Sequence, residues 1–197
     1  MCGPCRGASR GSHAAEGRHE PCGNGAAIIS GVGDDDFRDR VFRTIEIFSS
    51  KGAQVTFDPN IRFELLKDRP VEEIVGPVLR RCSILFPGEK ELLLLSGGRT
   101  VDESVERLIV LKKGSRGCTV FSANTRVHVP AFRIREVDPT GAGDCFDAGF
   151  LCGLRDGKDP EESARVAAAV GALNARAFGP MEGKISPRAV QSLLSRR

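Results

Sequence analysis

The stretch Val137–Phe150, VDPTGAGDCFDAGF, places a proline and a Gly-Ala-Gly turn directly before an apolar run that is typical of a buried helix. Gly141 and Gly143 let the backbone approach a ligand closely, and the following helix leaves its first amide hydrogens unpaired. Unpaired amides at the positive end of a helix dipole bind anions, above all phosphate. The stretch therefore predicts a phosphate-binding turn ahead of a helix over about residues 144–156.

Asp144 stands directly after this turn, and two interpretations fit it. An aspartate after a tight turn commonly caps a helix by accepting a hydrogen bond from a backbone amide. A carboxylate is also a poor neighbour for a bound phosphate unless it accepts a hydroxyl proton as that oxygen attacks a phosphoryl group. Spacing alone favours the cap and leaves the catalytic role open.

Strands and helices alternate on both sides of this turn. Apolar residues at helical spacing, ended by Gly52, predict a helix over residues 35–52. The alternation predicts an α/β fold, a mostly parallel sheet with helices on both faces, in which ligands bind beyond the carboxyl ends of the strands. Strands are expected over residues 26–32 and 53–58, helices over 70–80 and 160–177, and a short strand running into a helix over 82–97. Residues 108–122 are expected to form two strands joined by a glycine-containing hairpin turn, and residues 125–134 an extended segment.

Composition limits the classes of partner. The chain has 197 residues, with 29 basic and 26 acidic side chains, and this balance argues against nucleic acid and membrane surfaces as partners. The longest apolar runs are far shorter than a membrane span of about 20 residues. Several of the 7 cysteines lie in apolar segments, where a free thiol acts as a small hydrophobe, so we expect a cytoplasmic protein.

The first 26 residues have no apolar periodicity, and we expect them to be a disordered leader ahead of a domain over residues 27–197. The leader lacks the apolar core of a secretory signal. A zinc site is a weaker alternative, because Cys-x2-Cys can hold one edge of a metal ion while the other spacings match no standard finger. Its ligands would be Cys2, Cys5, Cys22, His13 and His19.

The turn and four further segments occur in the order found in the ribokinase-like, or PfkB, family of carbohydrate kinases. The sequence DPTGAGDCFDAGF resembles the family's C-terminal signature, Asp-Thr-x-Gly-Ala-Gly-Asp-x-Phe, which is long and specific. The other segments that resemble the family are FDPNIR (57–62), FPGEKE (86–91), LKKGSRG (111–117) and GALNARAFGPMEG (171–183).

The resemblance implies an ATP-dependent, magnesium-dependent carbohydrate kinase. By that resemblance, Asp144 deprotonates the sugar hydroxyl, and Glu91 holds Mg²⁺ through water. The remaining implied roles are phosphoryl stabilisation by the amides of Gly141, Ala142 and Gly143, phosphate and substrate binding by Asn60 and Arg62, and nucleotide binding by Lys112, Gly114 and Gly117.

Structural interpretations stand beside these roles. Arg62 could form a surface ion pair, Glu91 could be an exposed helix residue, and the glycines of KKGSRG would serve any hairpin. The small residues at positions 164, 168, 171 and 175 favour close helix packing over a cofactor site.

The chain also departs from the family's pattern. It matches only the second half to two thirds of a family member, so the N-terminal sugar-binding part and the lid are expected to be lacking, and the product to be truncated. Position 88 is glycine where the family has asparagine or serine. Residues 96–108 allow only a short helix, so part of the apolar sheet surface is expected to be exposed. Such a surface could be covered by a second copy of the chain, in a homodimer, or by another partner.

The leading hypothesis is therefore a kinase that transfers the γ-phosphoryl group to a sugar or sugar acid, with a leaning towards 2-keto-3-deoxygluconate. The alternative is a non-catalytic remnant that binds nucleotide or a protein partner. A dinucleotide-binding oxidoreductase is disfavoured, because the glycine turn lies late in the chain and no acidic residue closes a strand about 20 residues on.

Overall fold

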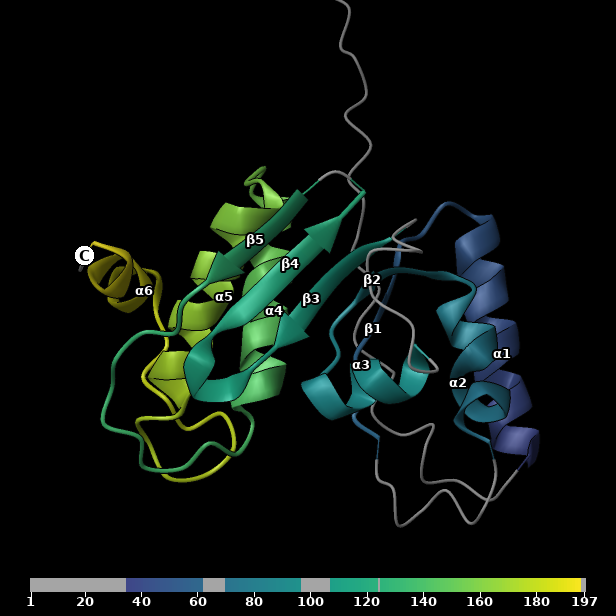
Figure 1. The fold of residues 1–197 in the computed structure, drawn as a ribbon, viewed down its shortest axis with the longest axis horizontal. Helices are drawn as coiled ribbons and strands as arrows, with labels where there is room; N and C mark the ends of the chain where they lie inside the picture. The colour runs from purple at the N-terminus through teal and green to yellow at the C-terminus, as the bar shows by residue number, and fades with distance from the viewer. Residues whose placement is uncertain (1–34, 62–69, 97–106, 124, 196–197) are drawn as a thin grey trace, which may run out of the picture.

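The computed structural model describes residues 35–61, 70–96, 107–123 and 125–195 (Figure 1). The strand expected over residues 26–32, the leader and its zinc alternative, and Arg62 lie outside the described residues. In chain order the elements are α1 (Asp35–Ser50), β1 (Val55–Phe57), α2 (Val71–Leu79), β2 (Cys82–Leu85), α3 (Glu89–Leu95), β3 (Leu108–Lys112), the short 3-10 helix η4 (Gly114–Arg116), β4 (Cys118–Ser122), β5 (Thr125–Val129), α4 (Ala142–Arg155), α5 (Pro160–Asn174) and α6 (Pro187–Leu194).

The sheet has five described strands in the spatial order β1-β2-β3-β4-β5. The β1–β2 and β2–β3 pairs are parallel, whereas the β3–β4 and β4–β5 pairs are antiparallel. Four of the five strands therefore run in one direction, with β4 opposed to them. The predicted α/β class is confirmed, as is the hairpin expected within residues 108–122, which is the β3–β4 pair.

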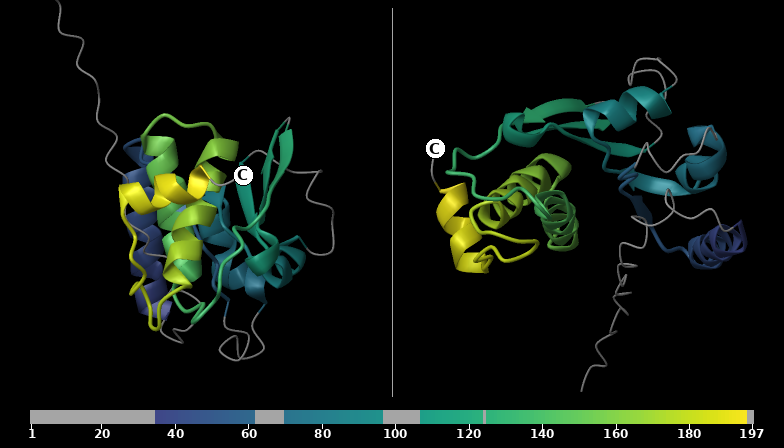
Figure 2. Two further views of the ribbon diagram at one scale, coloured as in Figure 1. Left: turned by 90° about the vertical axis from the view of Figure 1, so that its left-hand side faces the viewer. Right: turned by 90° about the horizontal axis from the view of Figure 1, so that it is seen from below.

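Helices cover both faces of the sheet (Figure 2). Phe86, Val110 and Val120 pack on one face against α4 and α5, where the Phe86 and Phe150 rings meet edge to face. Phe57 and Ile109 lie in a second core with residues of α1, α2 and α3. Because strands alternate their side chains between faces, buried residues on both sides require an apolar run, as the sequences of β2 and β3 provide.

Local signals explain most of the helix ends. Gly52 adopts a φ of 85° just after α1, as expected of a glycine that ends a helix. Phe48, near the end of this helix, is 48% exposed, because the residues of α1 that reach the core lie nearer its middle. Helix α6 was not predicted, although Ser186 accepts a hydrogen bond from the Ala189 amide and Pro187 occupies the first turn, both of which are helix-start signals.

Helices α4 and α5 pack unusually closely because glycines line their contact. A Cβ at Gly149 would lie 3.0 Å from the Ala167 Cα, and one at Gly153 would lie 2.8 Å from the Ser163 Cα. Gly171 of α5 meets the carbonyl of Ala142 in the same way, at 3.0 Å. The small residues of α5 thus serve packing, as predicted, and they press α5 against the start of α4.

Within the described part of the chain, no helix is long and apolar enough to cross a membrane. The four described cysteines are free thiols.

Candidate active site

Three parallel strands end side by side at one edge of the sheet, and α4 begins nearby. Asp58 follows β1, Pro87 follows β2, and Lys112 is the last residue of β3. The amide of Lys112 donates to the Pro87 carbonyl at 2.8 Å, which holds two of these strand ends together. The carboxyl ends of the parallel strands therefore gather at one edge of the sheet, which is where α/β sheets bind ligands.

The glycine turn begins α4 earlier than predicted. Gly141 is the N-cap, with a left-handed φ of 73°, and the helix starts at Ala142 instead of Asp144. The left-handed residue turns the chain directly into the helical direction, so the turn needs no further residues. Asp144 is therefore the third residue of the helix, and the interpretation of Asp144 as the cap is wrong.

The backbone amides at the start of α4 are only partly engaged. The Ala142 amide donates to the Pro139 carbonyl at 3.0 Å. By contrast, the amides of Gly143 and Asp144 have no acceptor among the described residues, as expected for the first turn of a helix. The turn thus keeps an anion-binding character, centred on Gly143 and not on Ala142.

A set of hydrogen bonds fixes the shape of this turn. The two carboxylate oxygens of Asp138 accept from the amides of Thr140 and Gly179, each at 2.9 Å. The hydrogen bonds hold the pKa of Asp138 below its usual value, and those with Thr140 have the largest effect. The buried Asn174 donates its side-chain amide to the Thr140 carbonyl at 2.8 Å. The turn is therefore held on both sides before any ligand binds.

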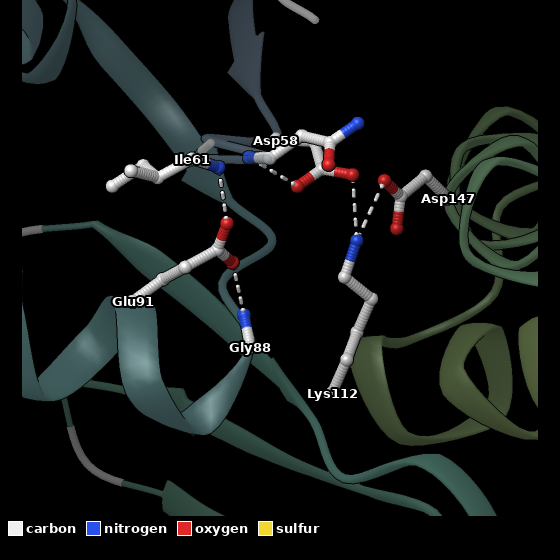
Figure 3. Close-up of polar contacts among 7 residues, drawn as sticks. Asp58, Ile61, Gly88, Glu91, Lys112 and Asp147 are labelled. Atoms are coloured by element: carbon white, nitrogen blue, oxygen red, sulfur yellow. Dashed lines mark hydrogen bonds and ion pairs between the residues drawn. The ribbon is translucent and has the colours of Figure 1, made fainter. Parts of the chain in front are cut away.

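Glu91 ties two strand ends together. Its Oε1 accepts from the Ile61 amide and its Oε2 from the Gly88 amide, each at 2.6 Å (Figure 3). Glu91 is the third residue of α3 and reaches back to the N-cap Gly88, as in a capping box. It is therefore engaged with backbone groups and is not the exposed helix residue of the structural alternative.

Lys112 lies between two carboxylates. Its ammonium donates to Asp58 Oδ2 at 2.7 Å and to Asp147 Oδ2 at 3.2 Å, and both carboxylates point towards it in Figure 3. Asp147 comes from α4 and is 1% exposed, and its Oδ1 has no hydrogen-bond partner among the described residues. The cluster connects the ends of β1 and β3 with the first half of α4.

Burial sets the protonation of this cluster. Burial, together with the nearby Asp58 carboxylate, raises the pKa of Asp147 to about 8, although Lys112 acts against that rise. Burial alone would lower the pKa of Lys112, but Asp147 and Asp58 outweigh it, and the net pKa is raised. At neutral pH Asp147 is therefore largely protonated beside the Lys112 ammonium.

The remaining predicted residues have clear local roles. Asn60 has a φ of 38°, in the left-handed region that asparagine tolerates, and its amide donates to Asp58 Oδ1 at 3.3 Å. Gly117 has a φ of 86°, and a Cβ there would lie 2.1 Å from the Val129 carbonyl oxygen. Gly114 has a φ of 57° with open space around it. Both glycines serve the hairpin, and their role in nucleotide binding stays a prediction.

Asp147 was missed from the sequence. Its only signal was its place three residues after Asp144, on the same side of a helix, within the otherwise apolar run CFDAGF. A carboxylate in such a run needs a buried partner, but the sequence does not show that the partner is Lys112.

Comparison with known proteins defines the family. The sequence model of the pfkB family of carbohydrate kinases matches residues 20–186, and the chain belongs to this family. It is 32% identical over 155 residues to fructokinase-1 of Oryza sativa subsp. japonica, covering 70% of this chain and 47% of that protein. A 2-dehydro-3-deoxygluconokinase of Bacillus subtilis is 26% identical over 169 residues, covering 81% of this chain and 52% of the relative.

The fold has the same neighbours. The apo crystal structure of a putative ribokinase II from E. coli superposes with a TM-score of 0.77 at 33% identity, covering 85% of this chain and 57% of that chain. The same E. coli protein has been solved in complex with ATP and Mg²⁺, with a TM-score of 0.76. The chain thus spans about half the length of the relatives that it matches.

Proposed function

We propose that this chain is the nucleotide-binding part of an ATP-dependent carbohydrate kinase that transfers the γ-phosphoryl group to a hydroxyl of a sugar or sugar acid. The observation that carries the proposal is the start of α4. There an exposed carboxylate, that of Asp144, lies in the same first turn as two backbone amides that have no acceptor among the described residues. A base next to an anion-binding turn is what attack of a hydroxyl on a phosphoryl group requires.

In the proposed step, Asp144 accepts the proton of the substrate hydroxyl. The hydroxyl oxygen forms a bond to the γ-phosphorus of ATP, the bond from that phosphorus to the β–γ bridging oxygen breaks, and ADP leaves with the electron pair. The amides of Gly143 and Asp144 donate to the phosphoryl oxygens, whose negative charge the dipole of α4 also stabilises.

The residues present fit a magnesium ion held mainly by substrate and water. Both oxygens of Glu91 accept a backbone amide, and each keeps a second lone pair that can accept from a water molecule. No group of three or more metal-ligating side chains occurs in the described ranges, and magnesium commonly takes few protein ligands and several waters. When bound, the ion neutralises charge on the triphosphate.

The substrate is proposed only as a class. Relatives include a fructokinase, a ribokinase and a cytidine kinase as well as the 2-dehydro-3-deoxygluconokinase. The sequence identity to the last of these, 26%, is no higher than that to the others. The leaning towards 2-keto-3-deoxygluconate therefore stays a hypothesis among sugars and sugar acids. A cytoplasmic location and a homodimer are likewise proposals.

Turnover tests the function. The full chain is assayed with Mg-ATP against fructose, ribose, cytidine and 2-keto-3-deoxygluconate, together with Asp144→Asn and the control Asp156→Asn at the far end of α4. We expect phosphorylation of one of these acceptors that Asp144→Asn removes and Asp156→Asn retains.

Two results would contradict this proposal. ATP binding without turnover, measured by calorimetry, would favour the non-catalytic remnant, an alternative to which the half-length match gives weight. Turnover that survives Asp144→Asn would show that another group is the base.

A further inference from the structure

The ammonium of Lys112 lies beside the open amides of α4. A Cβ built on Gly143 would lie 3.8 Å from Lys112 Nζ, and no other heavy atom comes within 4 Å of it, apart from the atoms of its own helix and chain neighbours. Because Gly143 has no side chain, nothing from residue 143 separates the ammonium from the turn. A full positive charge thus stands next to the partial charges of the helix N-terminus.

Two carboxylates restrict the movement of this ammonium. A lysine side chain has a flexible four-carbon stem, and Asp58 and Asp147 hold its end from two different elements. An ammonium has three hydrogens, of which two are used in these bonds. The third has no acceptor among the residues that the structure describes. The clamp therefore leaves one donor in a fixed place near the turn.

The charge of the cluster permits an anion to approach. Asp58, Lys112 and Asp147 face one another, with Asp144 one helical turn before Asp147. With Asp147 protonated, one negative charge fewer lies beside the Lys112 ammonium, and the repulsion of a phosphate is weaker than it would be with an ionised Asp147. Asp144 and Asp147 lie on the same helix. The hydrogen bond from Lys112 to Asp147 therefore also restrains the rotation of α4, and with it the position of Asp144.

We infer that Lys112 is a catalytic residue that donates its third N–H to the phosphoryl group transferred from ATP, and that Asp58 and Asp147 are positioning residues that hold it there. This inference rests on the proposed kinase function. It gives Lys112 a more specific role than lining the nucleotide, because it places the contact at the terminal phosphate.

Comparison of Lys112→Met with Lys113→Met tests the inference in the full chain. Lys113 is a matched control, since its ammonium donates to Thr119 Oγ1 at 2.8 Å and not to the cluster. We expect Lys112→Met to lower kcat about 100-fold, in the range found when one donor to a transition-state oxyanion is removed, with the sugar KM unchanged. Lys113→Met should change neither.

Binding gives a readout that does not depend on turnover. Calorimetry with ATP and with adenosine should show that Lys112→Met weakens ATP binding about tenfold and leaves adenosine binding unchanged. Equal loss for both ligands, or for neither, would overturn the inference. A parent chain that binds no ATP would overturn the proposed function and the inference together, whereas turnover that needs Asp144 but not Lys112 would overturn the inference alone.

A folding defect is separated by a second variant. Lys112→Met leaves the partly buried Asp58 without its cation, so the thermal stability of each variant is measured together with its activity. The double variant Lys112→Met/Asp58→Asn removes that unpaired carboxylate and should show the same loss of kcat and of ATP binding. Asp147→Leu alone keeps the Lys112–Asp58 pair but removes the second acceptor of the ammonium, and we expect a smaller fall in kcat, about tenfold, with Lys112 still present. A kcat per folded molecule equal to that of the parent in both variants would reduce the cluster to a structural clamp and refute the inference.

Discussion

Helices α3 and α4 begin near the same edge of the sheet with the same arrangement and opposite outcomes. Each has a glycine N-cap and an acidic third residue, Gly88 with Glu91 in α3 and Gly141 with Asp144 in α4. Glu91 reaches back and accepts from the Gly88 amide at 2.6 Å. Asp144 accepts from no described residue. One helix start is closed by its own carboxylate, and the other is open.

Side-chain length and the backbone of the cap explain the difference. Glutamate has one carbon more than aspartate, which lets it fold back on the N-cap amide. Gly88 has an extended backbone with a φ of −77°, whereas Gly141 is left-handed with a φ of 73°, so the two caps direct the chain differently. An anion site thus requires a helix start that the protein itself does not close, and α4 meets that requirement.

The largest expected effect is on catalysis at the open start. Asp144→Asn should lower kcat by about 10² to 10⁴-fold, the usual contribution of a general base. ATP binding should stay the same or become tighter, because the substitution removes a negative charge beside the phosphate. Steady-state kinetics and calorimetry measure the two effects. Weaker ATP binding in Asp144→Asn would show that its carboxylate does not lie beside the phosphate.

A smaller effect is expected on stability, through the buried Asp147 that links α4 to Lys112 of β3. The pKa of Asp147 is raised to about 8, so between about pH 4 and pH 8 the folded chain retains a proton that the unfolded chain has lost. Stability should fall as pH rises through this window, by at most about 1.4 kcal/mol per pH unit, and level off above it.

Urea unfolding at pH 5 and pH 8 checks this prediction, with Asp147→Asn as the comparison. The variant cannot ionise and should lose the decline. Lys112 does not interfere, because its raised pKa changes stability only at more alkaline pH. The same decline in both proteins would assign it to another group.

A smaller loss of stability is expected when the hydrogen bonds of Glu91 at the start of α3 are removed. Glu91→Ala removes the acceptor of the Ile61 and Gly88 amides and should lower the free energy of unfolding by about 1–3 kcal/mol. Glu89→Ala, at the exposed first residue of the same helix, is the control and should cost less than about 1 kcal/mol. Equal losses would show that the tie between α3 and the end of β1 contributes little.

The smallest effect should follow from making the two starts alike. Asp144→Glu lengthens the carboxylate so that it can reach back towards the Gly141 amide, as Glu91 reaches Gly88. Occupation of the open start should weaken ATP binding about tenfold, or about 1.4 kcal/mol, with little change in melting temperature. Unchanged ATP affinity would mean that the left-handed cap, and not side-chain length, keeps α4 open.

The elements of the fold could be predicted from the sequence because their signals are local. Apolar periodicity and Gly52 predicted α1, alternation predicted the α/β sheet, and KKGSRG predicted the hairpin. The predicted positions of helix ends were less accurate, because they depend on the backbone conformation of single residues. Helix α4 began at Ala142 because Gly141 is left-handed, and α6 was missed although Ser186 and Pro187 signal its start.

For this protein, the sequence alone determined the family signature and the presence of an acidic residue after a glycine turn, because motif spacing is read along the chain. Only the tertiary structure decided which carboxylates accept hydrogen bonds from the protein itself and which stay available to a ligand. Asp58 lies 54 positions and Asp147 35 positions from Lys112, so the cluster forms only when β1, β3 and α4 pack together. Glu91 and Asp144 look equivalent in sequence, and they differ because backbone direction and burial, which are properties of the folded chain, set what each carboxylate can reach.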